Sequence, residues 1–157
     1  MALTEPFWRS KKLDEMTKDE WESLCDGCGR CCLLKRFEDD ALYYTDVACK
    51  MLDHDTCRCK DYENRQTLVP HCVSHTPSNV PDIYWWLPDT CGYRLVQEGK
   101  DLHWWHHLKC GDPKMVEYAG ISVKGTIVSE MIDGRLRWED EIEGRKWPNE
   151  SVKRKTL

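Results

Sequence analysis

Ten cysteines constrain this 157-residue chain more than any other feature, because eight of them fall between Cys25 and Cys72. Leu, Ile, Val and Phe together make up only about a fifth of the residues, a level at which a chain begins to look disordered. Thiols clustered in this way have three explanations. They form a disulfide scaffold, they are independently buried, or they bind metal.

Two of these explanations fit the chain poorly. A disulfide scaffold is typical of secreted chains shorter than about 100 residues. This chain is longer, and its first residues lack a basic region followed by an apolar stretch, so we expect no cleaved secretory signal. Independently buried thiols have no reason to cluster. Metal ligation is therefore favoured, and it would compensate for the thin aliphatic core because metal binding contributes directly to folding free energy.

The most informative stretch is the C-x-x-C-x-x-C-C run at residues 25–32. Its first half is typical of a zinc knuckle, and the full C-x-x-C-x-x-C spacing is that with which bacterial ferredoxins present three thiolates to an iron–sulfur cluster. Gly27 and Gly29 would supply the unusual dihedral angles of such a turn. Side chains of adjacent residues diverge, so we expect Cys32 to serve a second metal, to bridge two ions or to be a structural thiol, while Cys31 serves the first.

Further ligands lie downstream, and the thiols of residues 25–72 are numerous enough for two four-ligand sites. We also expect Cys91 in the first turn of a helix that begins near Pro88 and ends at Gly99, where a helix N-terminus favours the thiolate. Zinc and iron, including an iron–sulfur cluster, fit these ligands equally well. The candidate metal ligands are Cys25, Cys28, Cys31, Cys32, Cys49, Cys57, Cys59, Cys72 and Cys91.

Local patterns predict an α+β chain of short helices and a few short strands. A capping box from Thr17 to Glu20 starts a helix that leads into Cys25. The remaining expected elements are a strand at 41–45, a metal-ordered loop at 49–59, a helical turn at 61–65, a connection at 76–81, and a hairpin of 121–123 with 126–128 turning at Lys124-Gly125.

The predicted organisation is a small, irregular single domain over residues 1–157. Within it, residues 25–72 form the metal-binding core, residues 82–150 a C-terminal part that packs on it, and residues 151–157 a basic tail.

Charge and hydropathy limit the partners. A net charge of −5 and a pI of about 5.7 argue against nucleic acid, and no apolar run is long enough to span a membrane. These values do not exclude a protein partner. His103, His106 and His107 would share one face of a helix and could bind zinc, copper or nickel. Metal-free histidines that adjust local packing near pH 6 are the favoured interpretation.

The chain resembles the YcgN-type proteins of the bacterial CxxCxxCC cysteine-cluster family, described as zinc- or iron-chelating. The resemblance rests on the run at 25–32, on Cys49, Cys57 and Cys59, and on Cys59-Lys60-Asp61-Tyr62-Glu63-Asn64-Arg65. Gln66 replaces the proline common in the family, and Cys72 follows later than in its pattern. The resemblance implies a small cytoplasmic metal-binding protein and supplies no activity.

Metal binding through the cysteine cluster is therefore the leading hypothesis, with the cellular task open. The alternatives are an iron–sulfur oxidoreductase or accessory enzyme, a zinc-stabilised adaptor for protein interactions, and thiol–disulfide exchange through Cys28 and Cys31. The chain contains no nucleotide fingerprint or catalytic motif that would establish an enzyme. Thiol–disulfide exchange is disfavoured because no βαβ pattern surrounds the cysteines.

Overall fold

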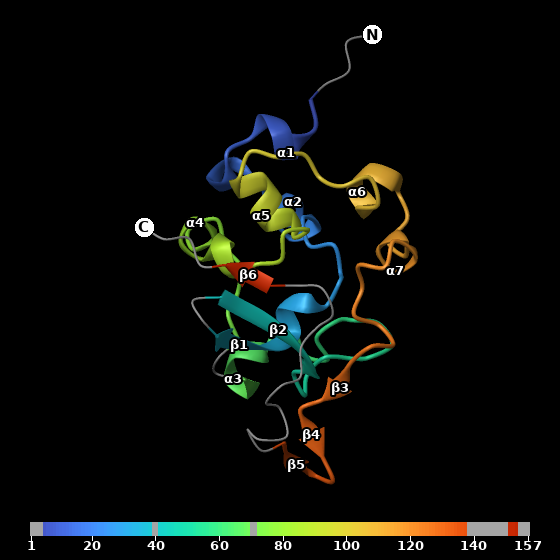
Figure 1. Cartoon of the computed structure of the whole chain (residues 1–157). Helices are drawn as coiled ribbons and strands as arrows, with labels where there is room; N and C mark the ends of the chain where they lie inside the picture. Colours follow the sequence, from blue (N-terminus) through green and yellow to red (C-terminus); the bar gives the residue numbers. More distant parts are fainter. Residues whose placement is uncertain (1–4, 39–40, 70–71, 138–150, 154–157) are drawn as a thin grey trace.

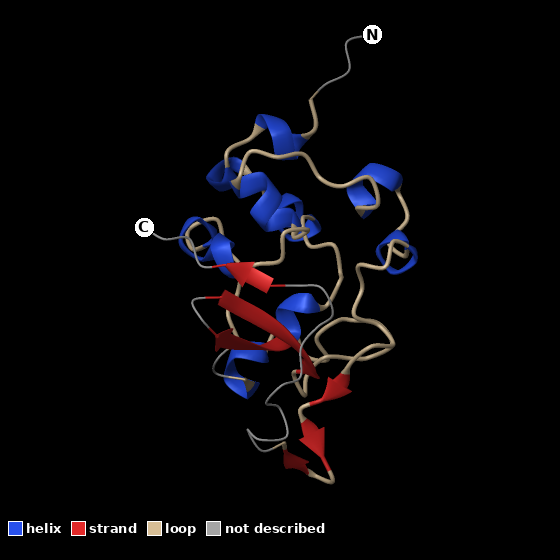
Figure 2. Cartoon of the chain, viewed as in Figure 1, coloured by secondary structure: helices blue, strands red, loops and turns tan. Residues whose placement is uncertain are grey.

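The computed structural model describes residues 5–38, 41–69, 72–137 and 151–153, which form short helices, one small sheet and a separate two-stranded hairpin (Figures 1 and 2). The longest described α-helices have six residues. The expected α+β class of short helices and a few short strands is confirmed. None of the described helices has both the length and the apolar character needed to cross a membrane.

The helices occur along the whole described chain and most span a single turn. Three of them, labelled η, are 3-10 helices. In order they are α1 (Phe7–Ser10), η1 (Leu13–Glu15), α2 (Lys18–Ser23), η2 (Arg30–Cys32), α3 (Arg65–Leu68), α4 (Val80–Ile83), η3 (Tyr84–Trp86), α5 (Gly92–Gln97), α6 (His107–Cys110) and α7 (Met115–Tyr118).

The sheet is organised around β2 (Ala41–Ala48), which contains the expected strand at 41–45. β1 (Leu33–Glu38) pairs with β2 in antiparallel register from Leu33↔Ala48 to Glu38↔Ala41, with an irregularity after Leu33. β3 (Val128–Ser129) runs parallel to the end of β2, and β6 (Ser151–Lys153) runs antiparallel to its beginning. β4 (Met131–Ile132) and β5 (Arg135–Leu136) form a separate hairpin.

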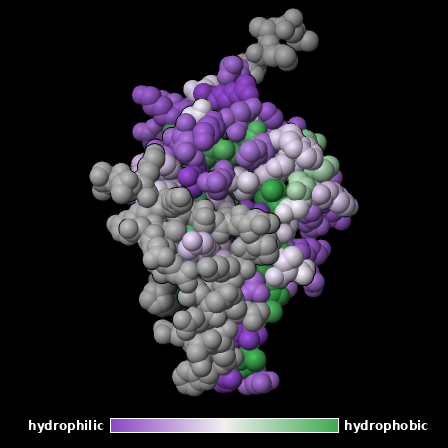
Figure 3. All heavy atoms as spheres, in the orientation of Figure 1, coloured by the Kyte–Doolittle hydropathy of each residue, from purple (hydrophilic) through white to green (hydrophobic). Residues whose placement is uncertain are grey.

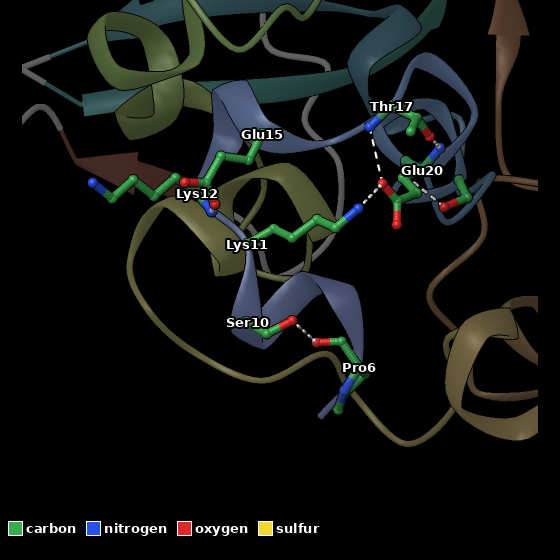
Figure 4. A network of polar contacts seen from close by, with 8 residues as sticks. Pro6, Ser10, Lys11, Lys12, Glu15, Thr17 and Glu20 are labelled. Carbon is green, nitrogen blue, oxygen red and sulfur yellow. Dashed lines mark hydrogen bonds and ion pairs between the residues drawn. The ribbon is translucent and has the colours of Figure 1, made fainter. Parts of the chain in front are cut away.

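The first helices are held by local polar contacts (Figure 4). The capping box is confirmed, because the Glu20 amide donates to Thr17 Oγ1 at 3.1 Å and the Thr17 amide to Glu20 Oε1 at 2.9 Å. Lys11 Nζ also donates to Glu20 Oε1 at 2.8 Å. Charged and polar residues cover this end of the molecule in Figure 3, while apolar residues reach the surface there only in small patches.

Several local expectations differ from the structure. The prediction of a hairpin at 121–128 is wrong. Residues 121–127 form a loop, and the hairpin that follows is formed by β4 and β5. The reason is that Val123 is fully buried and its amide donates to the Cys28 carbonyl at 2.9 Å, so it has no strand partner.

Three further boundaries are shifted. The helix expected from Pro88 begins at Gly92, because the Cys91 amide first donates to the Pro88 carbonyl in a turn. The helical turn expected at 61–65 occurs at α3. Residues 151–153 of the expected tail form β6, whereas 154–157 and residues 138–150 of the expected C-terminal part lie outside the described residues.

Candidate metal centre

The cysteine run forms a tight bend between α2 and β1. Gly27 and Gly29 have φ angles of +76° and +80°, which confirms the dihedral angles expected of this turn. Amides inside the bend point at acceptors in it. The Cys28 amide donates to Asp26 Oδ1 at 3.0 Å, and the Arg30 amide donates to Cys28 Sγ at 3.4 Å.

This bend lies where three apolar clusters meet. Cys25 packs against the cluster built by α2, α4 and α5. Cys28 belongs to a second cluster with Trp105 and Val116, and Cys32 packs against the sheet cluster. The position of each cysteine is therefore fixed by a different part of the core.

Four thiols line one pocket beside the bend. Its volume is about 330 Å³, including space open to solvent. It is lined by Cys25, Asp26, Cys28, Gly29, Cys31, His75, Pro88, Cys91 and Tyr93. Three of the thiols come from the run, and the fourth comes from Cys91, the N-cap residue of α5. Residues far apart in the sequence thus surround one space.

Gly92 explains how Cys91 reaches the run. A Cβ atom at Gly92 would lie 2.0 Å from the Leu24 carbonyl oxygen, so α5 approaches the end of α2 more closely than any side chain would allow. Because Leu24 precedes Cys25 and Gly92 follows Cys91, this close approach brings the two thiols to the same pocket.

Two histidines donate hydrogen bonds to the same stretch of backbone. His106 is buried, its Nδ1 accepts from the Leu108 amide at 3.1 Å, and its Nε2 therefore donates to the Leu24 carbonyl at 2.9 Å. His107 Nε2 donates to the Cys25 carbonyl at 3.2 Å. Burial lowers the pKa of His106 to about 4, so this imidazole stays neutral near pH 6, where a change of charge was expected. His103 stacks on Trp105.

Two polar atoms at the pocket are buried without a hydrogen-bond partner. They are Oδ2 of Asp26 and Nδ1 of His75, and both residues line the pocket. The His75 ring lies between Trp86 and Tyr93, with ring centroids 6.1 and 5.4 Å away. Buried polar groups normally find a partner. Two such atoms beside four thiols are consistent with a bound polar or metal-containing group.

Burial controls the protonation of the pocket thiols. It raises the pKa of Cys25 to about 12 and also raises the pKa of Cys28 and Cys91, against the lowered value expected for a thiol at a helix N-terminus. Hydrogen bonds from Cys32 and His75 instead lower the pKa of Cys31. The pocket thus combines protonated thiols with one thiol that ionises more readily.

The donor set fits a thiophilic metal group, since soft thiolates select zinc, copper(I) and iron–sulfur clusters. Within the described part of the chain, no three His, Cys, Asp or Glu side chains stand close enough together to hold a single ion. The four thiols therefore surround the pocket without converging on one point.

The other candidate cysteines lie elsewhere. The Cys49 amide donates to the Cys32 carbonyl at 2.8 Å beside the start of β1, and Cys59 forms an isolated bridge with Leu52. Cys57, expected as a ligand, has its thiol 3.5 Å from Ser122 Oγ. The exposed Cys110 thiol contacts the carbonyl oxygens of Trp105 and Asp112.

A pocket of four thiols on an irregular α+β fold defines a cysteine-cluster protein suited to thiophilic metals. Residues 24–92 match the CxxCxxCC family, described as "Putative zinc- or iron-chelating domain". The chain belongs to the UPF0260 family, which confirms the resemblance to YcgN-type cysteine-cluster proteins and supports binding of zinc or iron.

The similarity to individual UPF0260 proteins covers most of the chain. Identity to one from Rhizobium etli is 61% over 127 residues, 80% of each chain. Identity is 54% to one from Pseudomonas savastanoi pv. phaseolicola, over 90% of this chain and 95% of that one. For one from Parvibaculum lavamentivorans it is 52%, over 92% and 94%. No solved structure matches the chain.

Sequence reasoning did not identify Asp26 and His75 as part of the site. The C-x-x-H spacing from Cys72 to His75 is a signal that could have drawn attention to His75. No comparable signal exists for Asp26, because an aspartate inside a turn is most simply explained by its bond to a backbone amide.

Proposed function

We propose that the pocket binds an iron–sulfur cluster through Cys25, Cys28, Cys31 and Cys91. The observation that carries this proposal is that four thiols line one pocket without converging on a single ion. Four sulfurs bound to zinc at about 2.3 Å would lie roughly 3.8 Å from one another. A cluster spreads its iron atoms over a larger volume, and three of these thiols have the C-x-x-C-x-x-C spacing of ferredoxins.

Anaerobic purification followed by absorption spectroscopy and by iron and acid-labile sulfide analysis tests this proposal. We expect a brown protein that absorbs near ~400 nm. Cys28→Ser and Cys91→Ser should lose this absorption, whereas Cys110→Ser, which changes an exposed thiol outside the pocket, should retain it. If the wild-type protein is colourless and contains zinc, and if Cys28→Ser loses that zinc, the pocket binds zinc instead of an iron–sulfur cluster. Absence of any tightly bound metal would refute metal binding.

Removing the metal should also loosen the fold. The cysteine run joins three apolar clusters, and metal sites of this kind contribute on the order of 10 kcal/mol of apparent folding free energy. Chelator under reducing conditions should therefore reduce the circular dichroism signal and the resistance to protease. An unchanged melting curve after verified metal removal would contradict this expectation.

We further propose that the protein works in the cytoplasm. All ten cysteines are free thiols in the structure, and such thiols persist where glutathione and thioredoxin keep them reduced. Cell fractionation with immunodetection tests this assignment, and recovery of the protein in a periplasmic fraction would overturn it.

A further inference from the structure

The loop after β2 packs against the cysteine bend through two adjacent residues, Cys57 and Arg58. It meets the bend at the two glycines, which carry no side chain. A Cβ atom at Gly29 would lie 3.5 Å from Cys57 Cβ, and one at Gly27 would lie 3.1 Å from Arg58 Nη2. The loop therefore places one cationic side chain directly on the bend.

Local hydrogen bonds fix the part of the loop that carries Arg58. The Cys57 amide donates to the Asp53 carbonyl, and the Asp53 amide donates to the Arg58 carbonyl, both at 2.8 Å. The Asp53 carboxylate accepts from the Asp55 and Thr56 amides at 2.8 and 3.0 Å. The backbone of Arg58 is thus held in a tight turn while its side chain reaches the bend.

The Arg58 guanidinium lies across Gly27 and retains its hydrogen-bonding capacity. Its Nη2, Cζ and Nε atoms would stand 3.1, 3.4 and 3.8 Å from a Cβ atom on that glycine. Arg58 is exposed, and among the described residues its guanidinium has no hydrogen-bond or ion-pair partner. Because a guanidinium carries five N–H donors, this cation is available to a group bound at the bend.

A second cation near the bend, Lys35, differs in this respect. Its Nζ donates to the carbonyls of Cys31 and Leu33, both at 3.1 Å, and lies over the rings of Tyr44 and Trp86. Two of its three donors are thus committed to the backbone. Lys35 stabilises the start of β1 whether or not the pocket is occupied.

The charge of Arg58 reaches the pocket. Gly27 lies between Asp26 and Cys28, which line the pocket together with Cys25. Burial is the main cause of the raised pKa of Cys25, and the positive charge of Arg58 opposes that rise. Metal binding deprotonates thiols. Four thiolates therefore add negative charge that a divalent ion or an iron–sulfur core only partly balances.

We propose that Arg58 supplies the positive charge that balances the loaded pocket, and that it thereby raises the reduction potential of the bound group and slows its release. Arg58 acts through the charge of the thiolates and binds no metal itself. This inference rests on the proposed function, because it requires a thiolate-bound group in the pocket.

Two substitutions at Arg58 separate charge from packing. Arg58→Gln removes the charge and keeps a polar side chain, whereas Arg58→Lys keeps the charge. Loss of a positive charge makes the addition of an electron to the pocket group less favourable. We expect Arg58→Gln to shift the midpoint potential of the anaerobically purified full chain to a more negative value, and Arg58→Lys to restore most of the wild-type value. A purely structural role would not follow the charge.

The rate of metal release to an excess of chelator gives a second measurement. Outer-shell partners of metal ligands typically contribute about 10–100-fold in metal affinity. Since Arg58 is exposed, we expect release from Arg58→Gln to be faster by about 10-fold, at the lower end of this range. Salt screens exposed charges, so the difference from the wild type should shrink as ionic strength rises.

Lys60→Gln is the matched control. It removes the same charge from an exposed residue of the same loop, and Lys60 is not among the atoms nearest to Gly27 or Gly29. We expect the wild-type potential and release rate. The role of Arg58 is refuted if Arg58→Gln behaves like the wild type, if Lys60→Gln has an equal effect, or if Arg58→Lys restores neither quantity.

The metal content of the wild-type chain decides the proposed function separately. A brown wild type with iron and sulfide supports the cluster, whatever the Arg58 variants do. If the wild type holds zinc instead, the cluster is refuted, and the rates of zinc release from the same four chains test Arg58. A wild type without tightly bound metal refutes both proposals.

Discussion

Gly92→Ala separates what helix propensity predicts from what the packing predicts. Gly92 is the first residue of α5, and alanine in a helix is favoured over glycine by up to about 1 kcal/mol. In the structure, however, the new Cβ would lie 2.0 Å from the Leu24 carbonyl oxygen and 3.1 Å from its carbon. These are backbone atoms, so relief requires α5 and the end of α2 to move apart by more than an ångström.

The cost follows from what that movement breaks. Overpacking of a well-packed core typically costs about 1–3 kcal/mol. Separation would also weaken the 2.9 Å hydrogen bond from buried His106 to the Leu24 carbonyl, and a buried donor left without its partner costs about 1–3 kcal/mol. We therefore expect Gly92→Ala to destabilise the protein by about 3–5 kcal/mol and to reduce the metal content of the pocket, because Cys91 moves away from Cys25.

Urea unfolding and metal analysis of the full chain measure both effects. Gly99→Ala, at the other end of α5, is the matched control. It meets no atom within 4 Å, but Gly99 has a φ of +72°, so we expect only a cost of about 1–2 kcal/mol and an unchanged metal content. If Gly92→Ala is as stable as the wild type and keeps its metal, the close contact between α5 and α2 does not exist, and the position of Cys91 at the pocket is refuted.

Two further predictions concern pH. The pKa of His106 is lowered to about 4 in the folded chain, so between pH 6.5 and pH 4 the unfolded chain binds a proton that the folded chain does not. The free energy of unfolding should therefore fall by about 3 kcal/mol between pH 7 and pH 4. Urea unfolding at several pH values tests this, and the same loss in His106→Gln would contradict it. The Asp101 carboxylate accepts hydrogen bonds from Arg9, from Lys109 Nζ at 2.6 Å and from Trp8 Nε1 at 3.0 Å, and these hold its pKa well below the usual range. Asp101→Asn should therefore cost about 1 kcal/mol at pH 7, with the difference from the wild type shrinking as pH falls below about 4, and a difference that persists at low pH would show that charge is not its cause.

The parts of the fold that the sequence predicted well depend on short-range interactions. The capping box at Thr17 uses two hydrogen bonds between residues three apart, and both partners are visible in the sequence. The prediction of a hairpin at 121–128 was wrong because a long-range contact determines the conformation of this segment. Val123 has a β-branched side chain, but its amide binds the Cys28 carbonyl, 95 residues earlier in the chain. No local pattern contains that information.

The residues of the candidate site also divide into those that the sequence predicted and those that it did not. The spacing of Cys25, Cys28 and Cys31 indicated a chelating turn, and the structure places all three at one pocket. Their ligand role and that of Cys91 stay predictions. Asp26 could not be identified from the sequence, because only tertiary burial leaves its second carboxylate oxygen without a partner, whereas the C-x-x-H spacing before His75 was a signal that was not used.

One of the segments that position the cysteine run lies outside the region that gives the run its family match. Residues 24–92 match the cysteine-cluster family, yet residues 106–123 hold the bend. His106 and His107 donate to the carbonyls of Leu24 and Cys25, while Arg30 Nε donates to the carbonyl of Ile121 at 3.0 Å. These contacts fix backbone atoms and leave the thiols free to face the pocket. The histidines therefore contribute to the candidate metal centre by positioning its backbone, which accounts for a histidine-rich segment beside the cysteines without requiring it to bind a metal ion.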